Sequence, residues 1–550
     1  MKFHFSRRGL QGREQIVERI GEIVPGASSW LILIGMPALA FAAPVIAAIL
    51  MIAFELYWLL RVLYMTLFLV LSHYWLTVEQ ATDWMLRVGH LDALIQSRQP
   101  PSRLTAATDA THPLSRWVYR RELSALQSSA CLPSPSQDIY HLAIFTIARE
   151  SRDVYEDGLR SLVRQAFPSQ RILVVLAVEE RSQPTIRAAA LAAQREFRRH
   201  FLDFLIVIHP DGLPGEARVK GANATYAAKA AAAYFAERQI ATERIVVSCF
   251  DADTVVSPSY FACLTYHFMV CPDRTRASFQ PIPVYHNNIW EVPGFARVLD
   301  VGSSFFQLIE ATNPDQLVTF SSHSMSFQAL VDIGYWPVDL ISDDSAIFWK
   351  AFIHCDGRYR VVPMYVTVSM DVAASESWRK TVVNVYKQKR RWAWGVENFP
   401  IVMRAFMQGK TLPLIRRLKH GYKLFEGHTA WATWPFLLTI IVWLPAIFAG
   451  HEFSNTVLYY SAPRVAATIF SLASVSLVTT IVSSVCLLPK PPVKNPLLRK
   501  VQHMFEWLMV PFIGIFLSAL PALDAQTRLM LGRYMEFWVT EKPRESSRGN

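Results

Sequence analysis

Long apolar stretches without charge constrain this chain more than any other feature of its sequence. Residues Gly26–Phe54 contain no Asp, Glu, Lys or Arg, and this run exceeds the roughly 20 residues that a helix needs to cross a bilayer. Apolar sequence resumes after Glu55 and continues to Trp75. We therefore predict membrane spans at residues 30–53 and 56–76, with a turn near Glu55. The first run is too long, and begins too far into the chain, for a cleaved signal peptide.

The C-terminal part of the chain contains further apolar stretches. Thr429–Gly450 and Val465–Leu488 carry no charge, and each predicts one more span, which gives about four in total. Phe505–Leu520 is also apolar, but it contains Glu506 and is closed by Pro521. It is consistent with a fifth span or with a segment that lies in the membrane interface or re-enters it.

The charge distribution agrees with a membrane protein. The chain is 52% hydrophobic and 18% charged, whereas an average soluble domain has about 25% charged residues. The formal net charge is +11, and basic residues gather beside the apolar stretches, as they do on cytoplasmic flanks. We therefore predict a multi-pass protein of the inner (cytoplasmic) membrane, with a cytoplasmic N-terminus, that binds membrane lipids and no nucleic acid. The clusters before the first and third spans are Arg7, Arg8, Arg13 and Arg19, and Arg416, Arg417, Lys419 and Lys423.

Between the membrane stretches, short β-rich runs alternate with helical patterns. This alternation predicts an α/β domain with a mainly parallel sheet. Ligands of such sheets bind beyond the carboxyl ends of the strands. The predicted strands are His141–Ile147, Ile172–Val178, Phe204–Ile208 and Ile245–Phe250, and the predicted helices between them are Val154–Ala166 and Ala222–Glu237.

Acidic residues directly follow two of these strands. Glu179 and Glu180 come after Val178, and Asp251 and Asp253 come after Phe250 as an Asp-x-Asp triplet. Such a triplet is common by chance and is often merely solvated, so its position after a buried strand carries the interpretation. Paired carboxylates can hold Mg²⁺ or Mn²⁺, which neutralises a diphosphate leaving group.

A second acidic pair, Asp343-Asp344, precedes a helical run at Ser345–Ile353. Ser and Asp favour the start of a helix, so one interpretation is a helix cap. A carboxylate at that place can also take a proton from an acceptor hydroxyl. The two roles are compatible.

A third motif is the spaced set Gln388, Arg391 and Trp392, just before the predicted interfacial helices. Arginine and glutamine can hold a diphosphate, and an indole can serve as the floor for a sugar ring. The alternative is a basic amphipathic helix with a tryptophan at the lipid interface.

The order and spacing of these elements resemble the membrane-integrated, processive members of glycosyltransferase family 2, such as cellulose, hyaluronan and chitin synthases. The resemblance covers about residues 140–400 and the flanking membrane segments. It implies a cytoplasmic α/β GT-A (Rossmann-like) domain inserted between transmembrane helices, with interfacial amphipathic helices. It also implies inverting, metal-dependent transfer of sugar from a nucleotide sugar, expected to be UDP-linked, to a growing polysaccharide that is exported across the membrane.

The resemblance implies a role for individual residues. Asp344 ends Ser342-Asp343-Asp344, which stands where the family has Thr-Glu-Asp, and would be the catalytic base beside Asp343. Asp253 would bind Mg²⁺ or Mn²⁺, and Trp392 would stack on the acceptor. Phe537-Trp-Val-Thr-Glu-Lys542 resembles the gating loop of cellulose synthases, which requires a cytoplasmic C-terminus and a non-crossing Phe505–Leu520. The expected donor contacts are Glu179, where the family usually has an aspartate that reads uracil, and Lys220, Asn223, Asp251, Gln388, Arg391, Thr540 and Lys542.

These predictions define a layout and leave alternatives open. One alternative is transfer of a single sugar to a lipid acceptor; another is a catalytically silent membrane scaffold. A second copy of the chain or an export partner are the protein partners considered. The six cysteines form no Cys-x-x-Cys pair, so we expect ordinary buried thiols and no structural zinc. The predicted segments are 1–80 with two transmembrane helices, 81–137 as linker, 138–400 as the GT-A domain, 401–428 as interfacial helices, 429–488 with two transmembrane helices, and 489–550 as the interfacial or re-entrant segment and gating loop.

Overall fold

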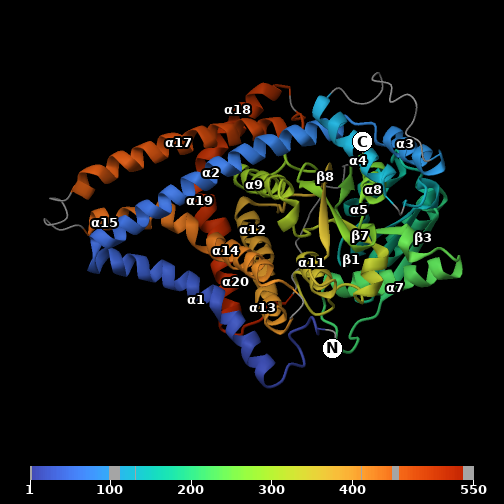
Figure 1. Ribbon diagram of the computed structural model, residues 1–550, viewed down its shortest axis with the longest axis horizontal. Coiled ribbons are helices and arrows are strands. Elements are labelled where there is room, and N and C mark those ends of the chain that lie inside the picture. Colours follow the sequence, from blue (N-terminus) through green and yellow to red (C-terminus); the bar gives the residue numbers. More distant parts are fainter. Residues whose placement is uncertain are drawn as a thin grey trace.

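The computed structural model describes residues 3–97, 112–129, 132–409, 412–448, 457–492 and 494–536. It consists of an α/β body and a group of long helices that projects from it (Figure 1). The helices on the N-terminal side of the body and within its first half are α1 Arg13–Ala42, α2 Pro44–Gln80, α3 Trp84–Ser97, α4 Pro113–Gln127, α5 Arg152–Val163, α6 Pro184–Phe197, α7 Lys220–Glu237 and α8 Tyr260–Val270. The later helices are α9 Gly294–Ala311, α10 Phe327–Asp332, α11 Asp343–His354, α12 Trp378–Ala393, α13 Asn398–Gln408, α14 Leu414–Thr439, α15 Leu444–Ile447, α17 Val457–Leu487, α18 Pro496–Glu506, α19 Val510–Ile513 and α20 Leu520–Met530.

The α/β body is built on a mixed sheet that has eight strands within the described residues, in the order β3-β2-β1-β4-β7-β6-β8-β5. The first four strands of this order are parallel, as the alternating sequence pattern predicts, and β7 is antiparallel to both of its neighbours. The strands are β1 Tyr140–Ile147, β2 Ile172–Glu179, β3 Asp203–His209, β4 Ile245–Asp251, β5 Val255–Val256, β6 Ala277–Val284, β7 His323–Ser326 and β8 Arg360–Ser369.

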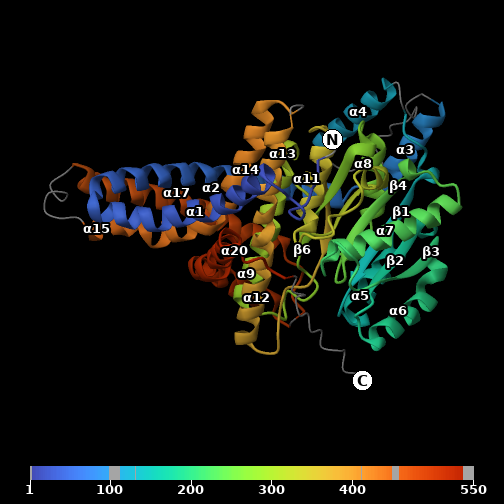
Figure 2. The same ribbon diagram turned by 90° about the horizontal axis from the view of Figure 1, so that it is seen from below.

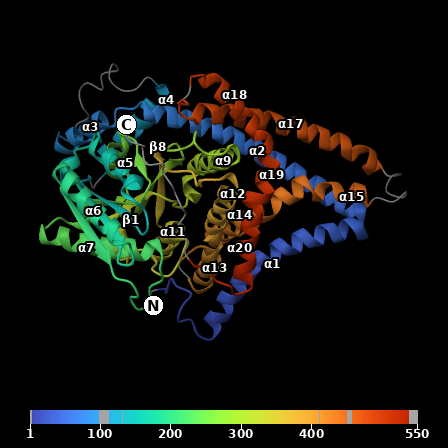
Figure 3. The ribbon, with the colours of Figure 1, turned by 180° about the vertical axis from the view of Figure 1, so that it is seen from behind.

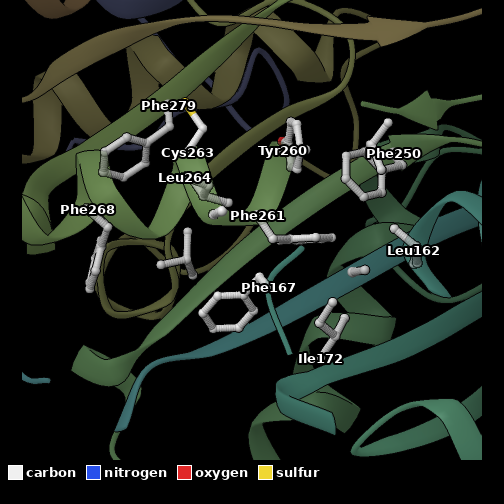
Figure 4. Close-up of a cluster of buried hydrophobic side chains, with 14 of the residues drawn as sticks. Leu162, Phe167, Ile172, Phe250, Tyr260, Phe261, Cys263, Leu264, Phe268 and Phe279 are labelled. Atoms are coloured by element: carbon white, nitrogen blue, oxygen red, sulfur yellow. The ribbon is translucent and has the colours of Figure 1, made fainter. Parts of the chain in front are cut away.

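Both faces of the sheet are covered by helices, which is why the central strands are continuous apolar runs. All eight residues of β2 are buried. On one face, side chains of α5, α6 and α8 join alternate strand residues in a core. Figure 4 shows the part of this core around α8. On the other face, α7, α11 and α13 complete a second core. The sheet is therefore held rigidly between two layers, and its strand ends are fixed in position.

The first pair of apolar helices differs from the prediction. The break lies at Ala43, between α1 and α2, and Glu55 lies inside α2, so the turn predicted near Glu55 is wrong. Pro44 is the first residue of α2. A proline ring clashes with the carbonyl four residues earlier, so it ends one helix while its fixed φ suits the first turn of the next.

The predicted boundary between interfacial and membrane segments at residues 428 and 429 also differs, because α14 is continuous through it. This helix continues to Thr439 and then bends by 47° into the segment that contains α15. Within the described residues, three helices are long and apolar enough to cross a membrane, or four if this bent pair counts as one span. The three are Arg13–Ala42, Pro44–Gln80 and Pro496–Met530.

The helical run Pro496–Met530 crosses the direction of α2 and α17, which pack side by side (Figures 1, 2 and 3). It lies between the α/β body and the projecting helices. One end is tied to α9 by the ion pair between Arg297 and Glu506, and the other to α12 by Arg390 and Asp524 at 2.8 Å. The run is long and apolar enough to span a bilayer, and its interfacial or re-entrant position stays a prediction.

Candidate active site

The predicted acidic residues gather at the carboxyl ends of the parallel strands. Glu179 ends β2 and Asp251 ends β4, and β1 lies between these two strands with Thr146 paired to Asp251. The N-termini of α7 and α11 approach the same edge, because both helices cover the same face. This edge therefore receives side chains from segments more than 150 residues apart in the chain.

Lys220 joins the two acidic clusters. Its ammonium nitrogen lies 2.9 Å from Oδ1 of Asp251 and 2.9 Å from Oδ1 of Asp344. The Lys220 side chain is 8% exposed, while the two carboxylates are about one-third exposed. The start of α7 can approach the segment before α11 this closely because residue 221 is glycine. A Cβ at Gly221 would lie 2.4 Å from the carbonyl oxygen of Pro337. A single buried cation thus holds the proposed base and the first residue of the triplet together.

Asp343 and Asp344 lie in different surroundings within this cluster. Burial opposes the charge of Lys220, but the carboxylates of Asp251 and Asp344 raise the pKa of Lys220 well above its usual range. Asp343 is 2% exposed, and its Oδ2 makes no hydrogen bond within the described part of the chain. Burial, together with the charge of Asp344, raises the pKa of Asp343 well above its usual range. Asp344 is therefore the accessible carboxylate of the pair, and Asp343 is not.

The two aspartates of the triplet have different surroundings. Asp253 is fully buried, and its Oδ2 accepts the backbone N–H of Asp371 at 2.7 Å. Asp251 is partly exposed, and its Oδ2 accepts a hydrogen bond from Ser321 at 3.0 Å. Ser321 has φ +45°, a left-handed conformation that few side chains adopt. The backbone of this loop is held in an uncommon shape where it contacts the acid.

The oxygen ligands at this edge fit Mg²⁺ or Mn²⁺. Both cations prefer carboxylates, and Mg²⁺ in particular is bound by one or two carboxylates together with phosphate oxygens of a substrate. Asp251, which is partly exposed, supplies such a carboxylate beside the buried cation of Lys220, whereas the carboxylate of Asp253 is fully buried two residues further along the chain. Within the described residues no three metal-binding side chains converge here, so phosphate oxygens of a substrate and water would complete the coordination.

The helix α12 carries the third motif. Trp392 is partly buried, with the Phe320 ring edge-on at 5.8 Å and the Tyr285 ring at 6.1 Å. Gln388 is 4% exposed, and its Oε1 makes no hydrogen bond to the described residues. The positive charge of Arg391 acts on Asp343, which places the motif next to the acidic cluster. The structure thus brings α12 to the same edge as Lys220.

The other residues predicted to contact the donor lie in different settings, and two of them lie outside the described part of the chain. Asn223 is buried and donates to the backbone oxygen of Ala177 in β2 at 2.8 Å, so its amide supports the strand. Glu179 is ion-paired with Arg181 and lines an open cavity of about 130 Å³ together with His209 and Arg218. Thr540 and Lys542 lie outside the described residues.

Sequence reasoning missed a residue that positions α12. Lys389 pairs with Asp300 of α9 at 2.7 Å, and both side chains are almost fully buried. The ammonium of Lys389 also lies 3.6 Å from the centre of the Trp392 ring. The signal available in the sequence was weak: a lysine between Gln388 and Arg391 looks like part of a basic helix surface.

Parts of this chain are similar to known glycosyltransferases. The model of the family described as "Glycosyl transferase family group 2" matches residues 246–483. Poly-beta-1,6-N-acetyl-D-glucosamine synthase of Staphylococcus aureus, in several strains, is 27% identical over 181 residues. That match covers 30% of this chain and 39% of the synthase, so the chain spans well under half of the relatives it matches.

Solved structures were also compared. The mannosyltransferase PcManGT from Pyrobaculum calidifontis, in complex with GDP-Man and Mn²⁺, is 14% identical and covers 72% of this chain and 94% of its own, with a TM-score of 0.37. TarS from S. aureus in complex with UDP-GlcNAc is 13% identical, with the same coverage and a TM-score of 0.33. No residue correspondence follows from superpositions at these TM-scores. The predicted parallel strands of the α/β sheet are confirmed, and residues 246–483 are similar to the glycosyl transferase family group 2 model.

Proposed function

We propose that this glycosyltransferase transfers a sugar, with inversion, from a UDP-linked donor to a growing polysaccharide and exports the product across the inner membrane. The observation that carries the proposal is the pair of contacts from Lys220 to Asp251 and Asp344. Through these contacts Lys220 links Asp344, the candidate base, to Asp251, the first residue of the candidate metal-binding triplet. The N-acetylglucosamine polymer made by the matched synthase suggests UDP-GlcNAc as the first donor to test.

Each group at the site has a distinct task in this proposal. Asp344 accepts the proton of the acceptor hydroxyl, whose oxygen then attacks the anomeric carbon as the bond to the diphosphate breaks. Lys220 and Arg391 bind the departing diphosphate through charge-assisted hydrogen bonds. A bound Mg²⁺ or Mn²⁺, held by Asp253 and Asp251, would neutralise part of the charge on the leaving group. Because attack and departure occur on opposite faces of the sugar, the anomeric configuration inverts.

The acceptor side is formed by α12. Trp392 presents a partly buried indole beside Phe320 and Tyr285, a platform of the kind on which a sugar ring can stack. The buried pair of Lys389 and Asp300 fixes that platform relative to α9. A platform held next to the base can receive the end of a chain repeatedly, which favours elongation over a single addition.

Donor turnover by the purified full chain in lipid nanodiscs tests the proposal. UDP-GlcNAc, other UDP-sugars and GDP-mannose are supplied in turn with Mg²⁺ or Mn²⁺, and release of nucleoside diphosphate is measured together with product size. Metal-dependent UDP release with a long product is expected. A single-sugar lipid product would select the alternative transferase, and donor binding without turnover would select the silent scaffold. An α-linked product from an α-linked donor would contradict inversion.

A further inference from the structure

A cluster of metal-binding side chains lies outside the proposed active site, where the end of α2 meets α8. Glu79 is the penultimate residue of α2, and Cys263 and His267 lie one turn apart on α8. One potential ligand atom from each, a carboxylate oxygen, the sulfur and an imidazole nitrogen, lies within 4.8 Å of the other two. The three residues come from segments separated by more than 180 positions, which is why cysteine spacing alone gave no sign of the cluster.

The side chains are buried and already oriented. Cys263 is fully buried and belongs to the apolar cluster drawn in Figure 4. Glu79 and His267 are each 12% exposed, with Oε2 and Nε2 4.0 Å apart. Nε2 of His267 is buried and makes no hydrogen bond within the described part of the chain. A buried polar nitrogen without a partner is costly, and a cation placed among these three atoms would satisfy it.

A neighbouring hydrogen bond fixes the carboxylate. The backbone N–H of Tyr365, in β8, donates to Oε2 of Glu79 at 3.1 Å. Such bonds from outside the ligand set orient the ligands of metal sites. The carboxylate of Glu79, at the end of α2, therefore accepts a hydrogen bond from β8 and lies beside the side chains of α8.

The donor set determines which metal fits. One thiolate, one imidazole and one carboxylate are typical ligands of Zn²⁺, with a fourth position left for water. In a tetrahedral zinc site the ligand atoms are roughly 3.5 Å apart, so the three groups need to close by about 1 Å. Zn²⁺ with one thiolate and one carboxylate is electrically neutral, which suits a buried place. The nearby charges of Arg87 and Glu122 also offset each other.

We propose that Glu79, Cys263 and His267 bind a zinc ion, with water in the fourth position, and that this ion fastens the end of helix α2 to α8 of the α/β body. Binding replaces the thiol proton of Cys263, which passes to solvent as the sulfur–zinc bond forms. The expectation from the sequence that no structural zinc is present is revised by this proposal. The site is separate from the oxygen-rich edge at Asp251 and Asp253, and it does not depend on the proposed reaction.

Metal analysis of the full chain, purified in detergent without chelators, tests the proposal. We expect about one zinc per chain. Replacement of zinc by Co²⁺ should give a near-ultraviolet thiolate-to-cobalt charge-transfer band, which an all-oxygen Mg²⁺ or Mn²⁺ site cannot produce. Cys263→Ser should abolish the band and His267→Gln should weaken or abolish it. Cys271→Ser, which changes a buried thiol at the end of the same helix, should leave the band unchanged.

Thermal unfolding gives a second readout. A zinc chelator should lower the Tm of wild type and of Cys271→Ser, and added zinc should restore it, whereas the Tm of Cys263→Ser should not respond. If Cys263→Ser does not fold, the cobalt band and the reversible chelator effect in wild type decide alone. Zinc far below one per chain with no thiolate band in wild type would overturn the proposal. So would a band that persists in Cys263→Ser, which would mean adventitious binding elsewhere.

Discussion

Replacement of Lys220 by methionine tests the central contact of the proposed active site. The change removes the ammonium group and keeps most of the side-chain volume, so Asp251 and Asp344 face each other without a cation between them. At 2.9 Å, each ion pair amounts to about 6 kcal/mol of Coulomb attraction at an effective dielectric of about 20. Most of this attraction is offset by the cost of burying the lysine.

The net effect is smaller than the Coulomb figure because both carboxylates are about one-third exposed and water screens them. We expect Lys220→Met to destabilise the domain by about 1–3 kcal/mol, a Tm decrease of roughly 3–8 °C. The pKa of Lys220 is raised on folding, so its contribution is complete at neutral pH and is lost only as the pH rises through that raised pKa, above 10.5. The Tm difference should therefore stay constant between about pH 6 and pH 9.

The assay combines Tm with donor kinetics. Lys220 contacts the acids that would face the diphosphate, so the donor KM should rise and kcat/KM should fall about 100-fold or more. Lys229→Met is the matched control, because Lys229 is exposed on the same helix α7, and it should behave like wild type. A Lys220→Met protein with wild-type Tm and wild-type donor KM would refute the reasoning.

Four further predictions follow from the site and from the topology. Asp344→Asn should lower turnover by at least about 100-fold with donor affinity retained, whereas Asp343→Asn should keep most activity. Because the pKa of Asp343 is raised on folding, Asp343→Asn should also be more stable than wild type, by a margin that grows as the pH rises above about 4; equal Tm at all pH values would contradict this. Trp392→Ala should lose polymer synthesis about tenfold or more while it retains UDP affinity and membrane insertion, and normal polymerisation by the inserted fraction would favour an interfacial anchor instead. Glu545→Cys in a Cys486→Ser background should resist a membrane-impermeant thiol reagent in intact cells, since the C-terminus is expected in the cytoplasm; labelling there would discard the gating-loop hypothesis.

Much of the sheet could be predicted because it depends on local patterns. The buried parallel strands are continuous apolar runs, and their carboxyl ends must lie at one edge, so the positions of Glu179 and Asp251 followed directly. The helix expected at Ser345–Ile353 is present but begins two residues earlier, at Asp343, with Ser342 rather than the acidic pair at the N-cap. The length of an apolar run likewise determined that the chain has helices able to cross a membrane.

Tertiary structure decided what those patterns leave open. Pro37 and Pro44 both lie in the first apolar stretch, yet Pro37 lies inside α1 and only Pro44 coincides with the break between the two helices, because packing against neighbouring elements decides which proline a helix accommodates. Asp343 and Asp344 are adjacent and identical in sequence, but the helix rotates one into the protein and leaves the other accessible. The contact between Lys220 and Asp344, and the meeting of Glu79 with Cys263 and His267, join segments more than 100 residues apart. No local periodicity encodes such pairings, since they arise only when separate elements pack on a common sheet.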